Sequence, residues 1–257
     1  MTDMKKKPKT SWGKVAKWYD ELLEKSPDTY QAKVILPNLL RLLEPRAGQA
    51  LLDIACGQGF FTRALAARGA SATGADISSE LIALAKRASP ASIPFHIAPA
   101  DKLAFAKNKS FDTALIVLAL QNIENLDGVI AEAARALKPG GRFLIVLNHP
   151  AFRIPGRSSW NWDEAAQAQY RRVDAYLSES RAKIEMHPGD DPGVHTISFH
   201  RPFQVYMKAL AKHGFVIARL EEWNSHRRSQ PGPRAKEEDR TRKEFPLFLC
   251  LEARLLP

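Results

Sequence analysis

The sequence predicts one α/β domain in which a parallel sheet carries helices on both faces. Short apolar runs alternate with helical stretches between about residues 50 and 148, which is the pattern of successive βαβ units. The first apolar run, ALLDIA at 50–55, leads directly into a glycine-rich turn. With 257 residues, of which 45% are hydrophobic, the chain is long enough to bury a large core.

The first part of the chain shows no strand pattern. Residues 1–10 are polar and basic, and we expect a disordered basic tail. Residues 11–25 have the pattern of a helix, with Ser11 as a candidate N-cap. A second helix is expected from the SPD motif at 26–28, which places proline in the first turn, to about Glu44.

Strands and helices alternate in the central part of the chain. The expected strands are 50–55, 71–76, 94–99, 112–120 and 142–148. The expected helices are 60–68, 78–88 and 127–137. Gly69 is placed to end the first of these helices, and the PGG motif at 139–141 ends the last one.

The alternation is interrupted between residues 149 and 201, a stretch rich in Trp, Arg, His and Pro. We expect a helix near 163–178 and a short strand near 194–199. So long an interruption of a compact domain is typically functional. The elements expected after it are a helix at 202–213, a strand at 215–223, a flexible solvated loop at 224–244 and a closing strand at 246–256.

The formal net charge of +10 raises the question of a nucleic-acid partner. Residues 1–9 hold four lysines against one aspartate, and residues 226–244 hold seven basic against four acidic residues. Six of the ten net charges therefore lie in two short polar segments. This distribution favours solvated tails over a nucleic-acid-binding face and leaves that partner disfavoured but open.

The two cysteines, Cys56 and Cys250, show neither a disulfide framework nor a metal-ligand spacing. We expect two reduced, buried thiols and no metal site. No apolar run is long enough to span a membrane, and no apolar segment follows the basic N-terminus as in a secretory signal. We therefore expect a cytoplasmic protein, either a monomer or a homodimer.

The sharpest functional signal is LLDIACGQGFFTRAL at 51–65, a strand that runs into a glycine-rich turn and then a helix. Gly57 and Gly59 permit a tight turn and close approach of a ligand. Asp76, at the end of the next strand, is placed to accept hydrogen bonds from ribose hydroxyls. A nicotinamide or flavin site is disfavoured, because Thr62 occupies the third glycine position of that motif and the acidic Asp53 lies inside the first strand.

Several motifs, in the right order, resemble those of one family. The run LDIACGQG at 52–59 is similar to the first motif of the class I S-adenosylmethionine (SAM)-dependent methyltransferases. Its first glycine is replaced by Ala55, a departure that many members share. The AKWYD motif at 16–20 is similar to a helix that lids the cofactor in the small-molecule, quinone-type branch. The other matching motifs are Asp76, Ala100-Asp101, Phe111-Asp112 with Gln121-Asn122, and LKPGGR at 137–142.

The resemblance implies a Rossmann-like, doubly wound seven-stranded sheet with N-terminal helices, in one domain over 11–257. The strand order would be 3-2-1-4-5-7-6, with the last strand antiparallel. SAM would lie across the carboxyl ends of strands 1 and 4. The residues expected at the cofactor are Tyr19, Asp53, Ala55, Gly57, Gly59, Asp76, Ile77, Asp101, Lys102, Leu118 and Gln121.

The insertion 149–201 is the expected lid over the methyl acceptor. We expect His149 or His200 to assist deprotonation, since imidazole titrates near neutral pH. The other chemical candidates in the insertion are Arg153, Trp160, Trp162, Tyr176, His195 and Arg201.

The expected function is methyl transfer from SAM to an O, C or N atom of a small-molecule acceptor, which gives S-adenosylhomocysteine. Two alternatives stay open: a methyltransferase that acts on RNA or protein, and a SAM-binding protein without catalysis. A dehydrogenase is a remote fourth reading. The sequence shows neither the motif of exocyclic-amine base methylation nor a cysteine placed for pyrimidine C5 methylation.

Overall fold

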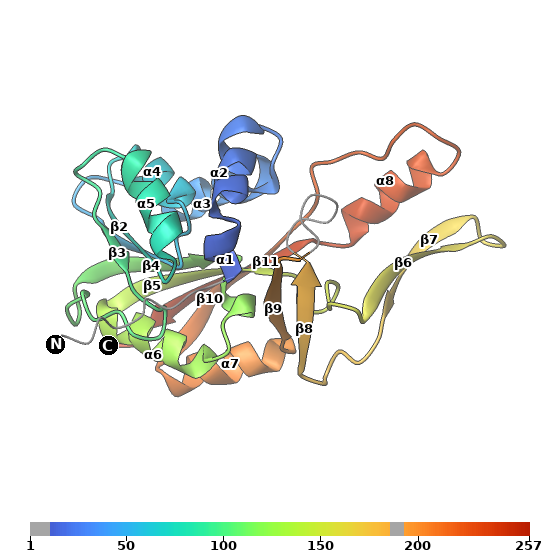
Figure 1. Cartoon of the computed structure of the whole chain (residues 1–257). Coiled ribbons are helices and arrows are strands. Elements are labelled where there is room, and N and C mark those ends of the chain that lie inside the picture. The colour runs from blue at the N-terminus through green and yellow to red at the C-terminus, as the bar shows by residue number, and fades with distance from the viewer. Residues whose placement is uncertain (1–10, 186–192) are drawn as a thin grey trace.

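The computed structural model describes residues 11–185 and 193–257, so the predicted tail at 1–10 lies outside the described residues. A seven-stranded sheet forms its centre (Figure 1), in the spatial order β10-β11-β5-β4-β1-β2-β3. Its strands are β1 (Ala50–Ile54), β2 (Ser71–Asp76), β3 (Phe95–Ile97), β4 (Phe111–Val117), β5 (Leu137–Asn148), β10 (Phe215–Trp223) and β11 (Phe248–Leu255). The strands β1 to β5 pair in parallel, and β11 is antiparallel to both its neighbours. The predicted order, with an antiparallel last strand, is confirmed.

Two helical layers cover the two faces of this sheet (Figure 1). One layer holds α3 (Leu36–Leu43), α4 (Phe60–Ala66) and α5 (Ser79–Arg87), and the other holds α6 (Leu126–Ala136) and α7 (Phe203–Lys212). Because side chains alternate along a strand, Leu51 packs in the core of α3 and α4, while Leu52 packs in the core of α6 and α7. The same alternation directs Asp53 toward α4.

The N-terminal helices differ in detail from the prediction. The expected helix at 11–25 is broken at Val15 into α1 (Ser11–Lys14) and α2 (Ala16–Lys25). The second helix begins later than expected, with a π-helical segment η1 (Gln31–Ile35) before α3. Its first turn is closed by Thr29, whose Oγ1 accepts from the backbone N–H of Ala32 at 3.2 Å. A hydroxyl therefore caps this helix, rather than the SPD motif upstream.

The insertion after β5 holds two antiparallel hairpins. The first pairs β6 (Ser158–Asp163) with β7 (Ala168–Val173), and the second pairs β8 (Ser180–Glu185) with β9 (His195–His200). The expected strand near 194–199 is confirmed by β9. The expected helix near 163–178 is wrong.

The turn that follows Asp163 explains why the predicted helix does not form. Asp163 accepts hydrogen bonds from the N–H groups of Ala165 and Ala166 through its Oδ1, both at 2.9 Å. The same side-chain bonding starts a helix when helical residues follow, but here Gln167 takes a left-handed φ of 47° and ends the turn. The chain then returns as β7, so Asp163 closes a hairpin instead of capping a helix.

The polar segment at 224–244 is also more ordered than expected, because it contains α8 (Ala235–Glu244). This helix has no apolar stripe, which is why the sequence pattern did not reveal it. Contacts to the first hairpin support it: Thr241 donates to the Gln169 carbonyl at 3.4 Å, and the Arg234 guanidinium lies 4.6 Å from the Trp162 ring. In Figure 1, α8 and the β6–β7 hairpin extend from the sheet on the same side.

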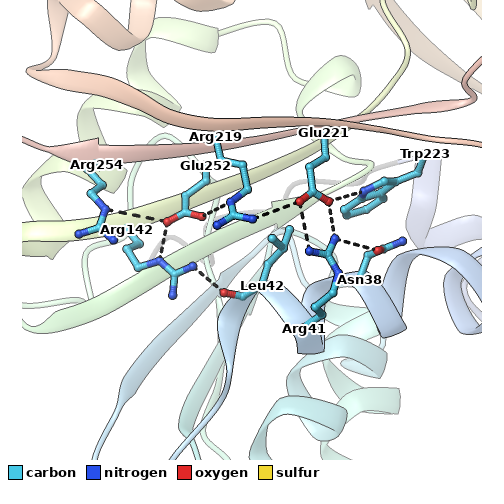
Figure 2. A network of polar contacts seen from close by, with 9 residues as sticks. All are labelled: Asn38, Arg41, Leu42, Arg142, Arg219, Glu221, Trp223, Glu252 and Arg254. Carbon is cyan, nitrogen blue, oxygen red and sulfur yellow. Dashed lines mark hydrogen bonds and ion pairs between the residues drawn. The ribbon is translucent and has the colours of Figure 1, made fainter.

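A polar network fastens α3 to the outer strands of the sheet (Figure 2). Its centre is Glu252 of β11, which is buried and lies 2.8 Å from the Nε of Arg142 on β5. Arg142 also donates to the Leu42 carbonyl of α3 at 2.6 Å. A second, exposed pair joins Arg41 of α3 to Glu221 of β10. The network thus fixes the helix that precedes the glycine-rich turn.

Candidate functional site

The glycine-rich turn between β1 and α4 is built from left-handed residues. Ala55, Gly57 and Gly59 have φ values of 56°, 58° and 83°. Glycine adopts this region without cost, whereas an L-residue such as Ala55 pays about 1–2 kcal/mol. Leu118, at the end of the neighbouring strand β4, has a φ of 52°. Strained backbone of this kind is concentrated at ligand sites, and both Ala55 and Leu118 line the cavity described below.

Asp76 lies at the carboxyl end of β2, facing the turn. Its Oδ2 accepts from the N–H of Gly57 at 2.9 Å and its Oδ1 from the N–H of Ser78 at 2.8 Å. The side chain is buried, and burial raises the pKa of this carboxyl while the two N–H donors oppose the rise. Each carboxyl oxygen keeps a further lone pair for a ligand.

Asp53 is the second carboxylate of this region, one layer below the turn. Its Oδ2 accepts from the hydroxyl of Thr62 on α4 at 2.6 Å. Burial raises the pKa of Asp53 to about 7, although the Thr62 hydroxyl works against this rise. Asp53 is not among the residues that line the cavity. Its hydrogen bond with Thr62 therefore stabilises the first turn of α4.

A cavity of about 910 Å³ opens at the carboxyl ends of β1, β2, β4 and β5. Seven of the predicted cofactor residues line it: Ala55, Gly57, Asp76, Ile77, Asp101, Leu118 and Gln121. Three others, Asp53, Gly59 and Lys102, are not among its lining residues. The side chain of Tyr19, the remaining one, lies outside the described part of the chain.

Hydrogen bonds to neighbouring residues hold two polar side chains of this cavity in position. Asp101 accepts from the Nδ2 of Asn125 at 2.8 Å, and Asn125 in turn caps α6 by accepting from the N–H of Gly128 at 3.0 Å. Gln121 donates through Nε2 to the Leu118 carbonyl at 2.7 Å. The Oε1 of Gln121 is buried and has no partner among the described residues. An unsatisfied buried acceptor is costly, so this atom is available to a ligand donor.

The other end of the cavity is formed by the insertion at 149–201. Its wall contains Arg153, Ile154, Ser158, Arg171, Arg181 and Phe199. Of these, only Arg153 is among the candidates that the sequence singled out. Arg171 was missed because residues 163–178 were predicted as a helix, and Ser158 was missed because the strand β6 was not predicted. The signal that could have placed Arg171 at the cavity was the alternating direction of side chains along a strand at 168–173.

The two histidines expected as bases do not line this cavity. His149 is buried, its Nε2 lies 2.7 Å from Glu222 Oε1, and its ring stacks on Phe152 at 4.7 Å. Burial lowers the pKa of His149, while Glu222 opposes this change. His200 bonds the Tyr176 carbonyl at 2.8 Å and lines a separate, smaller cavity. A role for either histidine in deprotonation gains no support from this geometry.

Three further candidates of the insertion, Trp160, Trp162 and Arg201, contact other groups of the protein. Trp160 lies 4.9 Å from the Arg171 guanidinium, and Trp162 contacts Arg234. Arg201 is buried and donates to the backbone carbonyls of Ile123 and Glu124 at 2.9 and 2.7 Å. Within residues 11–185 and 193–257, no group of three or more His, Cys, Asp or Glu side chains is placed to hold a metal ion. No helix of these residues has the length and apolar character that crossing a membrane requires.

Comparison with known proteins decides the family. Residues 52–145 match the family model described as a methyltransferase domain. The chain is 30% identical to a SAM-dependent methyltransferase of Mesorhizobium loti, whose crystal structure superposes with a TM-score of 0.69 over 85% of this chain and 96% of that one. The chain belongs to the SAM-dependent methyltransferases. SAM is accordingly its cofactor.

Curated members of this methyltransferase family match over shorter stretches. The demethylmenaquinone methyltransferase of Tropheryma whipplei (strain Twist) is 38% identical over 113 residues, 43% of this chain and 46% of that protein. The ubiquinone biosynthesis O-methyltransferase of Thiobacillus denitrificans is 31% identical over 142 residues, 52% of this chain and 60% of that protein. The matched region thus spans about half of each relative.

The residues present fit SAM as a ligand. The left-handed turn at Ala55–Gly59 gives a ligand close approach to the backbone of this methyltransferase. Beside the turn lie the buried carboxyl of Asp76 and the unpartnered Oε1 of Gln121. These acceptors suit the hydroxyl and ammonium donors of a nucleoside joined to an amino acid. Each of these contacts is a prediction for this chain.

Proposed function

We propose that the protein transfers a methyl group from SAM to a small organic acceptor held between the sheet and the insertion at 149–201. One observation carries this proposal: a single cavity of about 910 Å³ joins the glycine-rich turn to both hairpins of the insertion. Sites for one small ligand occupy roughly 300–1,000 Å³. A cavity near the top of that range has room for a cofactor and an acceptor together.

The names of the relatives support a ring-bearing acceptor of the quinone-precursor type. Two of them are a demethylmenaquinone methyltransferase and a ubiquinone biosynthesis O-methyltransferase. The family model ends at residue 145 and therefore does not include the insertion. The family model therefore supports the cofactor end of the cavity, whereas the acceptor end is argued from the lining residues of the insertion. We leave the methylated atom as O, C or N. Cytoplasmic location and a monomeric or homodimeric state stay predictions from the sequence.

The chemistry makes modest demands on the protein. Bound SAM supplies an activated methyl group for in-line displacement. The chain must align the acceptor and exclude water, and the insertion covers the cavity for this purpose. A general base is needed only if the attacking atom must lose a proton.

The test is an incubation of the purified protein with methyl-labelled SAM and a cell extract divided into small-molecule, RNA and protein fractions. We expect label in the organic-soluble small-molecule fraction. Label in RNA or protein alone would overturn the proposed acceptor class and would favour the alternative that the +10 charge suggests. Binding of SAM with no transfer to any fraction would support the alternative of a non-catalytic SAM-binding protein.

The Asp76→Ala variant tests the cofactor end of this proposal. We expect SAM affinity to fall more than about tenfold, which corresponds to roughly 1.4 kcal/mol, because the variant loses the acceptors expected for the ribose. Calorimetric titration measures the change. Asp112→Ala is the matched control: Asp112 also accepts a backbone N–H, from Ala50 at 2.8 Å, but lies at the start of β4 and away from the cavity. Equal SAM affinity in the two variants would refute the assignment of Asp76.

A further inference from the structure

Three arginines line the part of the cavity wall that the insertion forms: Arg181 of β8, whose guanidinium lies 5.8 Å from the Phe199 ring, and the pair Arg153 and Arg171. Arg153 follows β5, and Arg171 lies on β7 of the first hairpin. Among residues 11–185 and 193–257, neither member of this pair forms an ion pair with a carboxylate. Two positive charges therefore face the same space without a described counter-ion.

Arg171 is held rigidly by neutral groups. Its Nε and Nη2 donate to the Phe152 carbonyl at 2.8 and 2.5 Å, and its Nη2 donates to the Ser158 hydroxyl at 2.7 Å. The guanidinium also lies 4.9 Å from the Trp160 ring. These contacts fix the position of the group and leave its charge uncompensated. A guanidinium oriented in this way loses little entropy when it binds an anion.

Arg153 is also held by neutral groups. Its Nη1 donates to the Asn148 side-chain carbonyl at 2.9 Å, and its guanidinium lies 6.0 Å from the Phe248 ring. Loss of hydration lowers the pKa of Arg153. Loss of hydration also lowers the pKa of Arg171, and the charge of Arg153 lowers it further. An anion bound at both guanidinium groups would offset their loss of hydration and the repulsion between the two charges.

Four acidic residues also line the cavity. Asp76 and Asp101 are at the cofactor end, where hydrogen bonds from the turn and from Asn125 hold them. Glu124 and Glu185 also line the cavity, but no ion pair joins either to Arg153 or Arg171 within the described part of the chain. Two carboxylates thus lie at the cofactor end, whereas Glu185 of β8 shares the wall of the insertion with the arginines but, among the described residues, pairs with neither Arg153 nor Arg171.

We propose that Arg153 and Arg171 bind an anionic group, a carboxylate or a phosphate, on the methyl acceptor. This inference rests on the proposed function and names the substrate class of the same site. Among the described residues, Arg153 keeps its Nε and Nη2 and Arg171 its Nη1 for such an anion, and guanidinium N–H groups form charge-assisted hydrogen bonds with both carboxylate and phosphate. The acceptor is thus an organic acid or a phosphate ester, whose anion is placed at the hairpin while its reacting atom points toward the cofactor.

The experiment measures binding of three probes that differ in charge: benzoate, phenyl phosphate and neutral benzyl alcohol. Affinities are determined by ligand-detected NMR for the full chain, with and without S-adenosylhomocysteine. The variants are Arg153→Met, Arg171→Met and Arg171→Lys. Arg172→Met is the matched control, because Arg172 neighbours Arg171 on the same strand, pairs with Asp174 at 3.0 Å and does not line the cavity. Thermal melting and S-adenosylhomocysteine affinity report whether each variant is folded.

We expect the wild-type protein to bind at least one anionic probe about tenfold or more tightly than benzyl alcohol. This preference should disappear in the two methionine variants, return in part in Arg171→Lys and persist in Arg172→Met. The tighter of the two anionic probes identifies the carboxylate or the phosphate as the recognised group.

Three results would overturn the inference. The first is equal binding of charged and neutral probes by the wild-type protein, and the second is an unchanged anion preference in both methionine variants. The third is loss of S-adenosylhomocysteine affinity in both folded variants, which would assign the arginines to the cofactor's own carboxylate. Failure of the wild-type protein to bind S-adenosylhomocysteine would instead refute the proposed function, and the probe series without that ligand would still decide the anion site.

Discussion

At the scale of single residues, two carboxylates near the ends of neighbouring strands have different surroundings. Asp76 accepts two backbone N–H groups and lines the cavity. Asp53 accepts one hydroxyl, from Thr62, and is only 1% exposed. The residue pattern placed both aspartates at the cofactor, but only the structure shows that Asp53 acts through α4. The Thr62 that argued against a dinucleotide motif is its hydrogen-bond donor.

The raised pKa of Asp53 makes a pH-dependent contribution to stability. The folded protein holds this proton up to a pH of about 7, whereas the unfolded chain releases it near 3.9. The folded state therefore binds more protons in this window, and stability falls as the pH rises through it. Between about pH 5.5 and 8, we expect wild-type protein to lose about 2 kcal/mol more stability than Asp53→Asn.

Urea unfolding of both proteins at the two pH values measures this difference. The asparagine side chain of the variant is neutral throughout and keeps an oxygen that can accept from Thr62, so all other titrations cancel between the two proteins. Parallel pH profiles would show that Asp53 does not retain its proton in the folded state.

Gly59 shows how tightly the turn is packed. A Cβ at this position would lie 2.9 Å from the Phe95 ring and 3.2 Å from the Ala85 side chain, and the φ of 83° disfavours any L-residue. Gly48 has a similar φ of 80° but open space around it. We expect Gly59→Ala to cost about 2 kcal/mol more than Gly48→Ala, because only the first adds overpacking to backbone strain.

Chemical denaturation of the two alanine variants checks this prediction. Equal losses would mean that the Phe95 ring yields to the added methyl group. In that case backbone strain alone would set the cost at Gly59.

At the scale of elements, local patterns gave the strands and helices of the central sheet but failed for two polar segments. A helix was predicted near 163–178, but Asp163 closes a turn with Ala165 and Ala166, and the left-handed Gln167 leads the chain back into β7. The α8 helix has no apolar stripe and depends on Thr241 and Arg234, which contact the hairpin. The hairpin and α8 stabilise each other through these contacts, so the structure of neither segment could be predicted from its own residues alone.

The network of Figure 2 connects α3 to the sheet through pairs of very different exposure. Arg142 and Glu252 have side chains that are 22% and 5% exposed, whereas Arg41 is 52% exposed. Removal of Arg142 leaves a buried carboxylate, which costs roughly 3–5 kcal/mol in fully buried pairs. Because Arg219 lies 3.7 Å from Glu252, we expect Arg142→Met to cost about 2 kcal/mol and Arg41→Met less than about 1.

Thermal and urea unfolding of these two variants provide the comparison. A loss in Arg142→Met no larger than in Arg41→Met would show that the remaining arginines fully compensate Glu252. The double variant Arg142→Met with Glu252→Met removes both partners of the pair. A recovery of stability in this variant would show that the loss in Arg142→Met comes from the unpaired, buried carboxylate of Glu252.

At the scale of the whole molecule, the net charge of +10 bears on the choice of acceptor. A small acceptor with one anionic group displaces few counterions, whereas RNA displaces many. We expect the rate of methyl transfer to fall less than about tenfold between roughly 50 and 200 mM salt. A loss on the order of 10³ would indicate six or more phosphate contacts and would contradict a small acceptor.

The sequence by itself determined the α/β class, and the resemblance carried by its motifs implied the strand order and the cofactor family. These features depend on signals that are local in the chain: alternating apolar runs, and a turn and two carboxylates near strand ends within residues 51–76. The part of the cavity wall that the insertion forms was decided only by the tertiary structure. Side chains alternate across a strand, so Asn148 lines the cavity while His149 next to it contacts Glu222. Arg153 and Arg171 line the same cavity because β7 returns along β6, which brings Arg171 within hydrogen-bond distance of the Phe152 carbonyl.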